Sequence, residues 1–506
     1  MGLAIGIDLG TSNSSAAIYR KGKVESIPIE GKKILPSVVS FRNDGQALVG
    51  NAAKARLYID PQNSVSSSKR FIGDSKKVYQ IQGQSLTPVD VAQKILEKIR
   101  IESGKYLGGE VTDAVITIPA YFTSEQREAT KKAGELAGFN VLRLLSEPTA
   151  AAIAYGLDKE RNQTIMVYDL GGGTFDVSIL KVENNSFKVV AVDGDSLLGG
   201  DDVDDTVAQY LLKSVSTDTS SNLHSEGSIA LQRIKEAAEE AKKELSVSDF
   251  TDISIPDVFG THIDEELDID TFNSLIQPLL DRTIEKIEDT LASAGLTKRD
   301  ISRVILVGGS TRIKAVQEIV TAQIKKPFIA DNVDEIVAQG AAIMAANLST
   351  PDYDSTPVPI EVEDAVSHSL GIDLVDSKDK VKKVFHLITK NSSLPCTGAT
   401  FAWTLRPFQT AIRMGVFQTE SEVPNDLDKL GELTLPVSSR AYHVSIVALF
   451  QIDENGILTF SSAEVEKDSP LMRAYDATDE VDIPLLEAMI SDGRLKHKEV
   501  IIQTNK

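Results

Sequence analysis

The sequence contains little of several things that would mark a specialised class of protein. Its single cysteine, Cys396, cannot form a disulfide within the chain, and its six histidines do not occur at metal-ligand spacing. No apolar run in the sequence approaches the roughly 18 to 20 residues that span a bilayer. These features argue against a disulfide scaffold, a zinc site built from cysteine and histidine, and a transmembrane helix.

Basic residues are also scarce relative to acidic ones. The chain has 53 Lys and Arg against 74 Asp and Glu, a formal net charge of −21, and no basic cluster interrupts this background. Nucleic acid and anionic membrane surfaces would therefore be repelled. The chain starts directly in a strand-like run at residues 3–9, without the basic stretch of a secretory signal. We expect a reducing, cytoplasmic compartment and neither nucleic acid nor membrane as a partner.

What the chain does contain is ordinary globular composition over a length that requires several domains. Its 506 residues are 42% hydrophobic and 25% charged, and a domain typically has about 100 to 200 residues. Up to about residue 350, short β-branched runs alternate with helical periodicity, a pattern typical of α/β layering. The predicted strands include 3–9, 114–119, 164–168, 187–192 and 303–307, and the predicted helices are 229–245 and 279–294, the second ended by Gly295.

The pattern changes after residue 352. Residues 353–365 contain prolines and acids but few bulky apolar residues, which indicates a linker. Residues 366–464 predict a small, mainly antiparallel β-domain, with strands at 386–389, 400–405, 411–418, 444–452 and 457–461. The pair Asn455-Gly456 predicts a hairpin turn between the last two strands. The tail, 465–506, predicts one short helix at about 484–492.

Two segments repeat one pattern at a constant offset of 161 positions. Residues 5–18 and 166–179 each contain a strand, an Asp-Leu-Gly turn, small polar residues and a second β-rich run. This repetition predicts two similar halves that face each other across a cleft and grip one ligand. Asp8 and Asp169 are each followed by backbone N–H groups that can cradle phosphate oxygens. A carboxylate beside a triphosphate would repel it. The two turns therefore imply that Mg²⁺ lies between the carboxylates and the phosphates and is held largely through waters.

A third glycine turn, GGSTR at 308–312, follows the apolar strand at 303–307. Its backbone can approach a nucleoside, and Arg312 can lie against a base. Each turn also has a plain structural interpretation, because Asp and Gly are common turn residues and glycine permits a tight strand-to-helix connection. The two facing copies favour the ligand-binding interpretation.

Seven segments together carry a resemblance to a known family. They are GIDLGTSNS (6–14), SKRFIG (68–73), ITIPAYF (116–122), SEPTAAAIAYGL (146–157), YDLGGGTFDVSIL (168–180), LGGDDVD (198–204) and ILVGGSTRI (305–313). They closely resemble the nucleotide-binding domain of the heat-shock 70-kilodalton, DnaK-type chaperones, over residues 1 to about 348. The β-domain is more weakly similar, through SLGIDL (369–374), ITKNSSLP (388–395) and IDENGILTFSS (452–462).

The resemblance implies an α/β fold in which an actin-like, duplicated ATPase domain (1–352) precedes a smaller antiparallel β-sandwich domain. It implies ATP or ADP with Mg²⁺ as ligands, and Asp8 and Asp169 as the residues that organise the waters of the metal. The implied catalytic residues are Lys69, at the γ-phosphate and attacking water, Glu147 and Asp176, which orient that water or accept its proton, and Asp169 and Thr174. The other residues implied to bind the nucleotide are Gly10, Thr11, Ser12, Asn13, Gly171, Gly172, Gly173, Gly199, Gly200, Glu239, Lys242, Lys243, Ser246, Gly308, Gly309, Ser310, Arg312 and Asp334.

Some of these positions have a second interpretation. Without the resemblance, Lys242 and Lys243 would be interpreted as a solvated helix face. By resemblance, Pro119, Arg127 and Lys131 form a relay between nucleotide state and the β-domain, and the last two lie one helical turn apart, so that both can face one partner. The candidate peptide-pocket residues are Val375, Phe401 and Ile412, for which β-sandwich core is an equally good interpretation.

Two features depart from the family pattern. The family linker usually carries a short run of leucines ending in Asp, whereas residues 360–364 here read IEVED. We therefore expect coupling between the domains to be weakened or re-routed. A C-terminal helical lid is expected to be missing, because only a short tail follows the β-domain, so a bound peptide should exchange quickly.

The leading hypothesis is an ATP-hydrolysing chaperone that binds unfolded or extended apolar polypeptide segments. Its co-chaperones, by resemblance, are a J-domain protein and a nucleotide exchange factor. A regulatory or scaffolding ATP-binding protein, whose β-domain docks one dedicated partner, is the alternative. A small-molecule kinase on the same fold is less favoured, because the resemblance supplies no sugar site.

Overall fold

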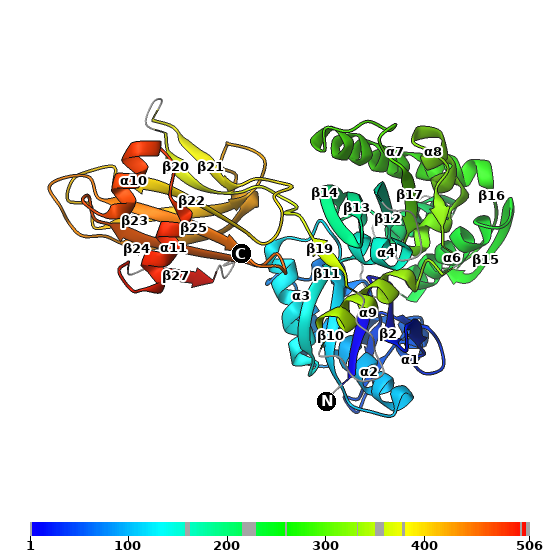
Figure 1. Cartoon of the computed structure of the whole chain (residues 1–506). Coiled ribbons are helices and arrows are strands. Elements are labelled where there is room, and N and C mark those ends of the chain that lie inside the picture. Colours follow the sequence, from blue (N-terminus) through cyan, green and yellow to red (C-terminus); the bar gives the residue numbers. More distant parts are fainter. Residues whose placement is uncertain are drawn as a thin grey trace. The chain divides into compact units, whose positions relative to one another are not determined.

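The computed structural model describes residues 3–156, 162–214, 229–258, 261–330, 332–349, 359–376, 380–495 and 498–501. It is a mixed α/β protein that divides into two compact units (Figure 1). Unit 1 comprises Met1–Phe122 and Gln126–Glu363, and unit 2 comprises Thr123–Glu125 and Asp364–Lys506. Most of the predicted linker, 353–358, lies outside the described residues, as do 496–497 and 502–506 of the predicted tail. Among the described helices, none has the length and apolar character that crossing a bilayer requires.

The first large sheet of unit 1 has six strands, and its centre carries the first Asp-Leu-Gly turn. β1 (Leu3–Leu9) pairs in parallel with β10 (Val111–Ile118) and antiparallel with β2 (Asn13–Arg20). Ile5 and Ile7 of β1 are fully buried in one apolar cluster with residues of α2 (Pro88–Leu107). The turn that follows Asp8 therefore closes the β1–β2 hairpin on a well-packed strand.

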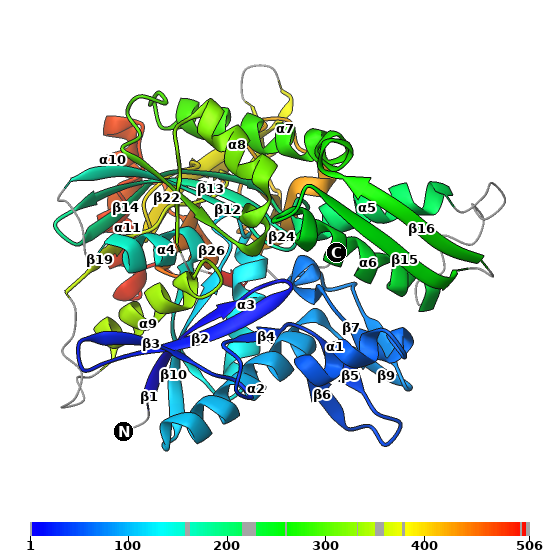
Figure 2. The same ribbon diagram turned by 90° about the vertical axis from the view of Figure 1, so that its right-hand side faces the viewer.

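The second large sheet also has six strands and repeats this pairing (Figure 2). β12 (Gln163–Leu170) pairs in parallel with β17 (Arg303–Val307) and antiparallel with β13 (Phe175–Glu183). In the β12–β13 hairpin, Asp169 lies directly opposite Asp176. The second Asp-Leu-Gly turn thus occupies the same place in its sheet as the first turn does in the other.

One helix packs closely against elements of both halves of unit 1. α9 (Ile336–Leu348) approaches β1 so nearly that a Cβ on Gly6 would lie 2.0 Å from the backbone nitrogen of Ala342. On α9 itself, a Cβ on Gly340 would lie 1.8 Å from the carbonyl oxygen of Ala150 in α4 (Glu147–Gly156). These close approaches fix α4, whose first residue is Glu147, relative to the strand that carries Asp8.

A short strand extends the second sheet at its edge. β19 (Glu361–Glu363) pairs in parallel with β14 (Ser186–Asp195). Lys188 Nζ lies 2.6 Å from Glu363 Oε1, and Asn347 Nδ2 donates to the carbonyl of Ile360 at 3.1 Å. The acidic side chains of this segment therefore do not prevent its strand pairing within unit 1.

Unit 2 contains two four-stranded antiparallel sheets that share one apolar cluster. Ile372, Met414, Phe450 and Phe460, from both sheets, are fully buried in that cluster. The first sheet has the order β21 (Lys382–Ile388), β20 (Leu370–Val375), β23 (Ala411–Gln418), β24 (Lys429–Pro436), and the second β22 (Cys396–Trp403), β25 (Ser445–Ile452), β26 (Leu458–Val465), β27 (Lys498–Ile501). The predicted hairpin at Asn455-Gly456 is confirmed, because β25 and β26 pair antiparallel around it.

Two helices follow β26, where the sequence predicts one. α10 (Pro470–Thr478) begins after Ser469, whose hydroxyl accepts the N–H of Met472 at 3.1 Å, and α11 (Ile483–Ser491) begins after Asp482. Leu471 of α10 is fully buried with Val447 and Leu449 of β25. α10 is too short for a strong periodic signal, so its start depends on the Ser-Pro cap and on packing across the sheet.

The predicted helix at 229–245 is confirmed as α6 (Ile229–Leu245), and the other predicted helix is longer than expected. α7 (Ile269–Ser293) begins after Asp268, whose carboxylate accepts the N–H of Thr271 at 2.7 Å, and it contains Pro278. A proline usually marks a helix start or break. The sequence pattern therefore does not predict the helical residues that precede Pro278. The predicted strands of both units are present, several with longer bounds.

Candidate active site

A buried ion pair lies in unit 1, near the two Asp-Leu-Gly turns. Lys69 Nζ donates to Glu147 Oε1 at 2.7 Å, and the two side chains are only 7% and 11% exposed. Lys69 comes from the 3₁₀ turn η2 (Ser68–Phe71), whereas Glu147 is the first residue of α4. The pair thus joins residues that are far apart in the sequence. Removing one partner of such a pair strongly destabilises the fold, because the other charge is left buried and unpaired.

Three aspartates belong to the same electrostatic cluster. Burial, followed by repulsion from Glu147, raises the pKa of Asp8 and that of Asp176 to about 7. The same two causes raise the pKa of Asp169 well above its ordinary value, and the nearby carboxylates of Asp176 and Asp8 add to them. Lys69 lowers each of these pKa values, but it does not offset the burial and the repulsion. The cluster therefore has a deficit of positive charge.

Asp8 and Asp176 each accept a hydrogen bond from a neighbouring element. The hydroxyl of Thr117, in β10, donates to Asp8 Oδ1 at 3.3 Å, and the backbone N–H of Tyr121 donates to Asp176 Oδ1 at 2.9 Å. These bonds favour the charged carboxylates and fix their direction.

The donor set fits a hydrated Mg²⁺ better than a directly ligated ion. Within the described residues, no group of three or more His, Cys, Asp or Glu side chains is arranged to hold a metal ion. Mg²⁺ prefers oxygen ligands, keeps several of its waters in proteins, and is often completed by substrate phosphates. Asp8 and Asp169, whose carboxyl groups lie beside the two facing turns, are the residues that would hold such waters.

The two Asp-Leu-Gly turns lie against each other. A Cβ on Gly172 would lie 1.9 Å from Ser12 Oγ, and a Cβ on Gly173 would lie 2.7 Å from Thr11 Cγ2, so larger residues do not fit there. The second turn is closed by the N–H of Gly171, which donates to the carbonyl of Thr174 at 3.0 Å. Thr11 and Thr174 are both buried. Gly10 and Asn13 complete the first turn, since a Cβ on Gly10 would lie 2.0 Å from the carbonyl oxygen of Asn13.

The other predicted glycine turns converge on the same place. Gly308 has a φ of 83°, and a Cβ there would lie 2.7 Å from Asp169 Oδ1. Ser310 Oγ donates to the carbonyl of Gly171 at 2.9 Å. The N–H of Gly200 donates to the same carbonyl at 2.9 Å, and Gly199 packs against Gly172. The structure therefore brings the predicted phosphate and nucleoside turns together.

The predicted adenosine residues lie on α6 and in the third turn. Lys242 is only 14% exposed, and its Nζ lies 2.8 Å from Asp204, so it is not part of a solvated face. Lys243 is half exposed and pairs with Glu239 at 2.8 Å. Ser246 Oγ donates to the carbonyl of Lys242 at 2.9 Å.

The third-turn part of this group is more exposed. Arg312 pairs with Asp334 at 2.6 Å, and both side chains are largely accessible. A Cβ on Gly309 would lie 3.4 Å from Asp334 Oδ1, so the turn and this carboxylate are neighbours. These two residues are thus close enough to act on one ligand.

The predicted relay residues occupy different environments. Arg127 is buried, and its guanidinium donates to the carbonyls of Ala120 and Phe122 at 3.1 Å each. It therefore fixes the loop after Pro119 that presents the Tyr121 N–H to Asp176. Lys131 is half-buried on the same helix. The relay assigned to Pro119, Arg127 and Lys131 by resemblance stays a prediction.

The structure does not bring the three candidate peptide-pocket residues together. Phe401 is buried under α10, with its ring centroid 4.7 Å from that of Tyr475. Ile412 is buried in the separate cluster between the two sheets. Val375 is half-buried at the end of β20.

Sequence reasoning missed four residues around the Lys69 turn. Ser67 and Arg70 lie on either side of Lys69 and contact Asp201 and Asp202 of α5 (Gly200–Ser214), respectively. All four lie in or beside the segments 68–73 and 198–204 that carry the family resemblance. Adjacency to Lys69 was the available signal, but the sequence alone does not reveal that the two segments meet.

Comparison with protein-family models gives a match to the family described as "Hsp70 protein". The match covers residues 4–82 and 74–498. It therefore spans nearly the whole chain and includes every residue of the cluster described above.

Proposed function

The chain belongs to the Hsp70 family, and from this premise we propose that it is an ATP-dependent chaperone. Family membership supports a chaperone-type function in general, and Hsp70 proteins are generally ATPases. In this proposal, unit 1 is an actin-like ATPase domain and unit 2 is a β-sandwich that binds extended apolar segments of unfolded chains. A J-domain protein and a nucleotide exchange factor are the co-chaperones that the family implies.

The observation that carries the proposal is the Lys69–Glu147 pair among three aspartates, beside two facing glycine turns. The reaction is attack of water on the γ-phosphorus of ATP, with cleavage of the bond to the bridging oxygen of ADP. Little covalent chemistry is required of the protein, so positioning and charge neutralisation supply most of the rate. Bound Mg²⁺ supplies neutralisation of phosphate charge.

The residues of the cluster divide these tasks. The Lys69 ammonium holds the γ-phosphate and the attacking water, while Thr11, Ser12 and the backbone of the Gly171–Thr174 turn hold phosphate oxygens. Glu147 orients the water, and Asp176 accepts its proton. A carboxyl with a pKa of about 7 is well matched to that role near neutral pH. Adenosine lies between α6 and the third turn, where Lys242 and Arg312 face it.

Steady-state ATP hydrolysis by the Asp169→Asn variant tests this proposal. We expect turnover to fall by about 10²- to 10³-fold, the usual cost of losing one electrostatic contact to the transition state. Asp44→Asn, at an exposed position of unit 1, is the matched control and should hydrolyse ATP at the parent rate. Unchanged turnover in Asp169→Asn would contradict the assigned mechanism.

A second candidate function is favoured by the arrangement of unit 2. Phe401 is covered by α10, and it does not share a pocket with Val375 and Ile412. This supports a regulatory or scaffolding protein whose second unit docks one dedicated partner. One stoichiometric partner in a pull-down would support it, whereas a broad set of unfolded clients would support the chaperone.

A further inference from the structure

The turn that carries Lys69 begins at a conformationally strained residue. Ser67 has a φ of 52° and a ψ of 25°, in the left-handed region that non-glycine residues seldom adopt. Its hydroxyl donates to Asp201 Oδ2 at 2.7 Å. The other oxygen of that carboxylate accepts the hydroxyl of Ser12 at 3.4 Å. A single carboxylate therefore contacts both the start of η2 and the first glycine turn.

The next residue of α5 contacts the same turn. Arg70 forms an ion pair with Asp202, and its Nε donates to the carbonyl of Gly173 at 3.2 Å. Asp202 Oδ2 also accepts the N–H of Gly199 at 2.7 Å. Lys69 thus lies between two residues, Ser67 and Arg70, that are both bonded to the first turn of α5 (Gly200–Ser214).

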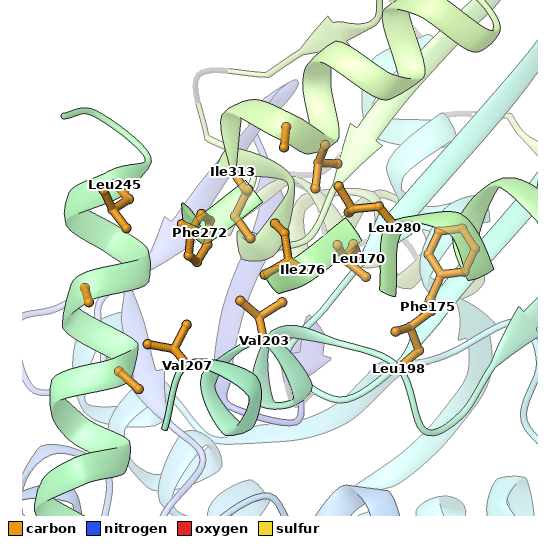
Figure 3. Packing of buried hydrophobic residues seen from close by; sticks show 14 of the residues in the cluster. Leu170, Phe175, Leu198, Val203, Val207, Leu245, Phe272, Ile276, Leu280 and Ile313 are labelled. Carbon is orange, nitrogen blue, oxygen red and sulfur yellow. The ribbon is translucent and has the colours of Figure 1, made fainter. Parts of the chain in front are cut away.

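α5 is itself packed into the apolar core, so it can hold the η2 turn in a fixed position. Val203 and Val207 project from α5 into the apolar cluster that contains Phe272 and Ile276 of α7 (Figure 3). Leu198, just before α5, is buried in the same cluster. Acidic residues in the first helical turn are also stabilised by the helix dipole.

We propose that Asp201 and Asp202 are positioning residues that clamp the Lys69 turn against α5. The clamp has two sides, Ser67–Asp201 and Arg70–Asp202, and it sets the place from which Lys69 reaches Glu147. It also ties this turn to both glycine turns, through Ser12 and Gly173. Its consequence for hydrolysis rests on the proposed function, whereas its effect on the turn does not.

The consequence for rate follows from geometry. A displacement of about 1 Å at a reacting group can cost about 10²-fold in rate. Without the Ser67–Asp201 bond, the left-handed start of η2 is not held, and Lys69 samples other positions. The effect should fall on kcat, because the phosphate-binding turns and the adenosine residues are left in place.

Hydrogen exchange of the nucleotide-free full chain tests the clamp directly. The N–H of Arg70 donates to the carbonyl of Ser67 at 3.2 Å, and that of Ile72 donates to the carbonyl of Lys69 at 3.1 Å, so these amides report on η2. In Ser67→Ala, we expect both to exchange about tenfold faster, the effect of losing one hydrogen bond to a charged group. Ser67→Asn should retain the parent rate, because Asn tolerates the left-handed conformation and its amide can donate to Asp201.

Two α5 variants complete the test. Asp201→Ala should accelerate the same amides, whereas Asp205→Ala, a half-buried position on the same helix whose carboxylate pairs with Lys235 rather than with η2, should not. The double variant Ser67→Ala/Asp201→Ala should match Asp201→Ala, because the Ser67 hydroxyl has no carboxylate to donate to once Asp201 is removed. Unchanged η2 exchange in Ser67→Ala would overturn the proposal, since that substitution leaves α5 intact.

ATP hydrolysis supplies the second measurement. Ser67→Ala should lower kcat by about 10-fold or more, up to the 10²-fold expected of a displaced group, with little change in KM. A change confined to KM would overturn the assigned positioning role. If the parent chain itself did not hydrolyse ATP, the proposed function would fail, while the exchange experiment would still decide whether the clamp exists.

Discussion

The charged cluster of unit 1 (Lys69, Glu147, Asp8, Asp169 and Asp176) and the helix-covered sheet of unit 2 are both buried, but burial has opposite consequences in them. In the charged cluster, burial raises the pKa of Asp8 and Asp176 to about 7, which means that it disfavours their charged forms. In unit 2, Phe401 buries an apolar ring against Tyr475. Burial of charge destabilises a fold and burial of apolar surface stabilises it. The comparison indicates that Phe401 stabilises the fold, whereas the buried carboxyl groups reduce its stability.

The largest effect is expected at the buried ion pair. Lys69→Met should lower ATP turnover by about 10²- to 10³-fold, because a transition-state contact is lost. It should also lower the free energy of unfolding by about 3 to 5 kcal/mol, because Glu147 remains buried without its partner. Hydrolysis assays and urea unfolding of the nucleotide-free chain measure the two effects.

A double variant separates these two losses. In Lys69→Met/Glu147→Gln, no unpaired charge remains at this pair, so most of the stability should return while hydrolysis stays low. Turnover at the parent rate in the double variant would contradict the assigned role of Lys69.

On the other side of the comparison, Phe401→Ala should destabilise unit 2 by about 3 to 5 kcal/mol, the usual cost of deleting a buried aromatic ring. The single tryptophan of the chain, Trp403, reports this unfolding, because its ring lies 6.2 Å from that of Phe401 and 6.0 Å from that of Tyr475. Val375→Ala, at a half-buried position, should shift the same fluorescence transition far less. Equal shifts in the two variants would show that Phe401 has no special structural role.

The buried carboxyl group of Asp176 should make the free energy of unfolding depend on pH. The pKa of Asp176 is about 7 in the folded chain against an ordinary value of 3.8. Between about pH 4 and pH 7, the folded state therefore retains a proton that the unfolded state has released, so stability falls as pH rises.

Asp176→Asn removes this dependence, because the amide stays neutral. The variant should be more stable than the parent by an amount that grows from about pH 4 to pH 7, reaches at most about 4 kcal/mol, and then stays constant. Urea unfolding of the nucleotide-free chains at pH 5 and pH 8 measures the difference. A stability gap that is equal at both pH values would argue against a protonated Asp176 in the folded chain.

The smallest effect is expected at the exposed pair on β19. Lys188 and Glu363 are 50% and 39% exposed, so Glu363→Gln should cost only about 0.2 to 1 kcal/mol, as surface ion pairs do. β19 is held by backbone pairing with β14, which the substitution leaves in place. A large loss of stability in this variant would show that the acidic linker depends on charge rather than on strand pairing.

The sequence predicts those parts of the fold that local patterns determine. β17 and α6 have the predicted bounds because each is a regular apolar pattern with clear ends. α7 begins before its predicted start because Pro278 conceals a capped turn upstream. α10 is missed because its two buried residues, Leu471 and Met472, gain their stability from a distant sheet.

The candidate site shows the same limit. Asp8 and Asp169 are identifiable from the repeated glycine turns, whereas Lys69, Glu147 and Asp176 are identified only by the family resemblance. The sequence does not show that Lys242 is buried against Asp204, nor that Ser67 meets Asp201, because these contacts join distant segments. Apolar pocket and apolar core have the same composition, so Phe401 and Ile412 could be assigned to one pocket although they belong to different clusters.

The proposed chaperone function requires that ATP turnover in unit 1 respond to binding of an extended chain by unit 2. Steady-state ATP hydrolysis of the full chain, with and without a saturating short apolar peptide, measures this response. A working chaperone should hydrolyse ATP faster in the presence of the peptide. Hydrolysis that is the same with and without bound peptide would contradict the coupling.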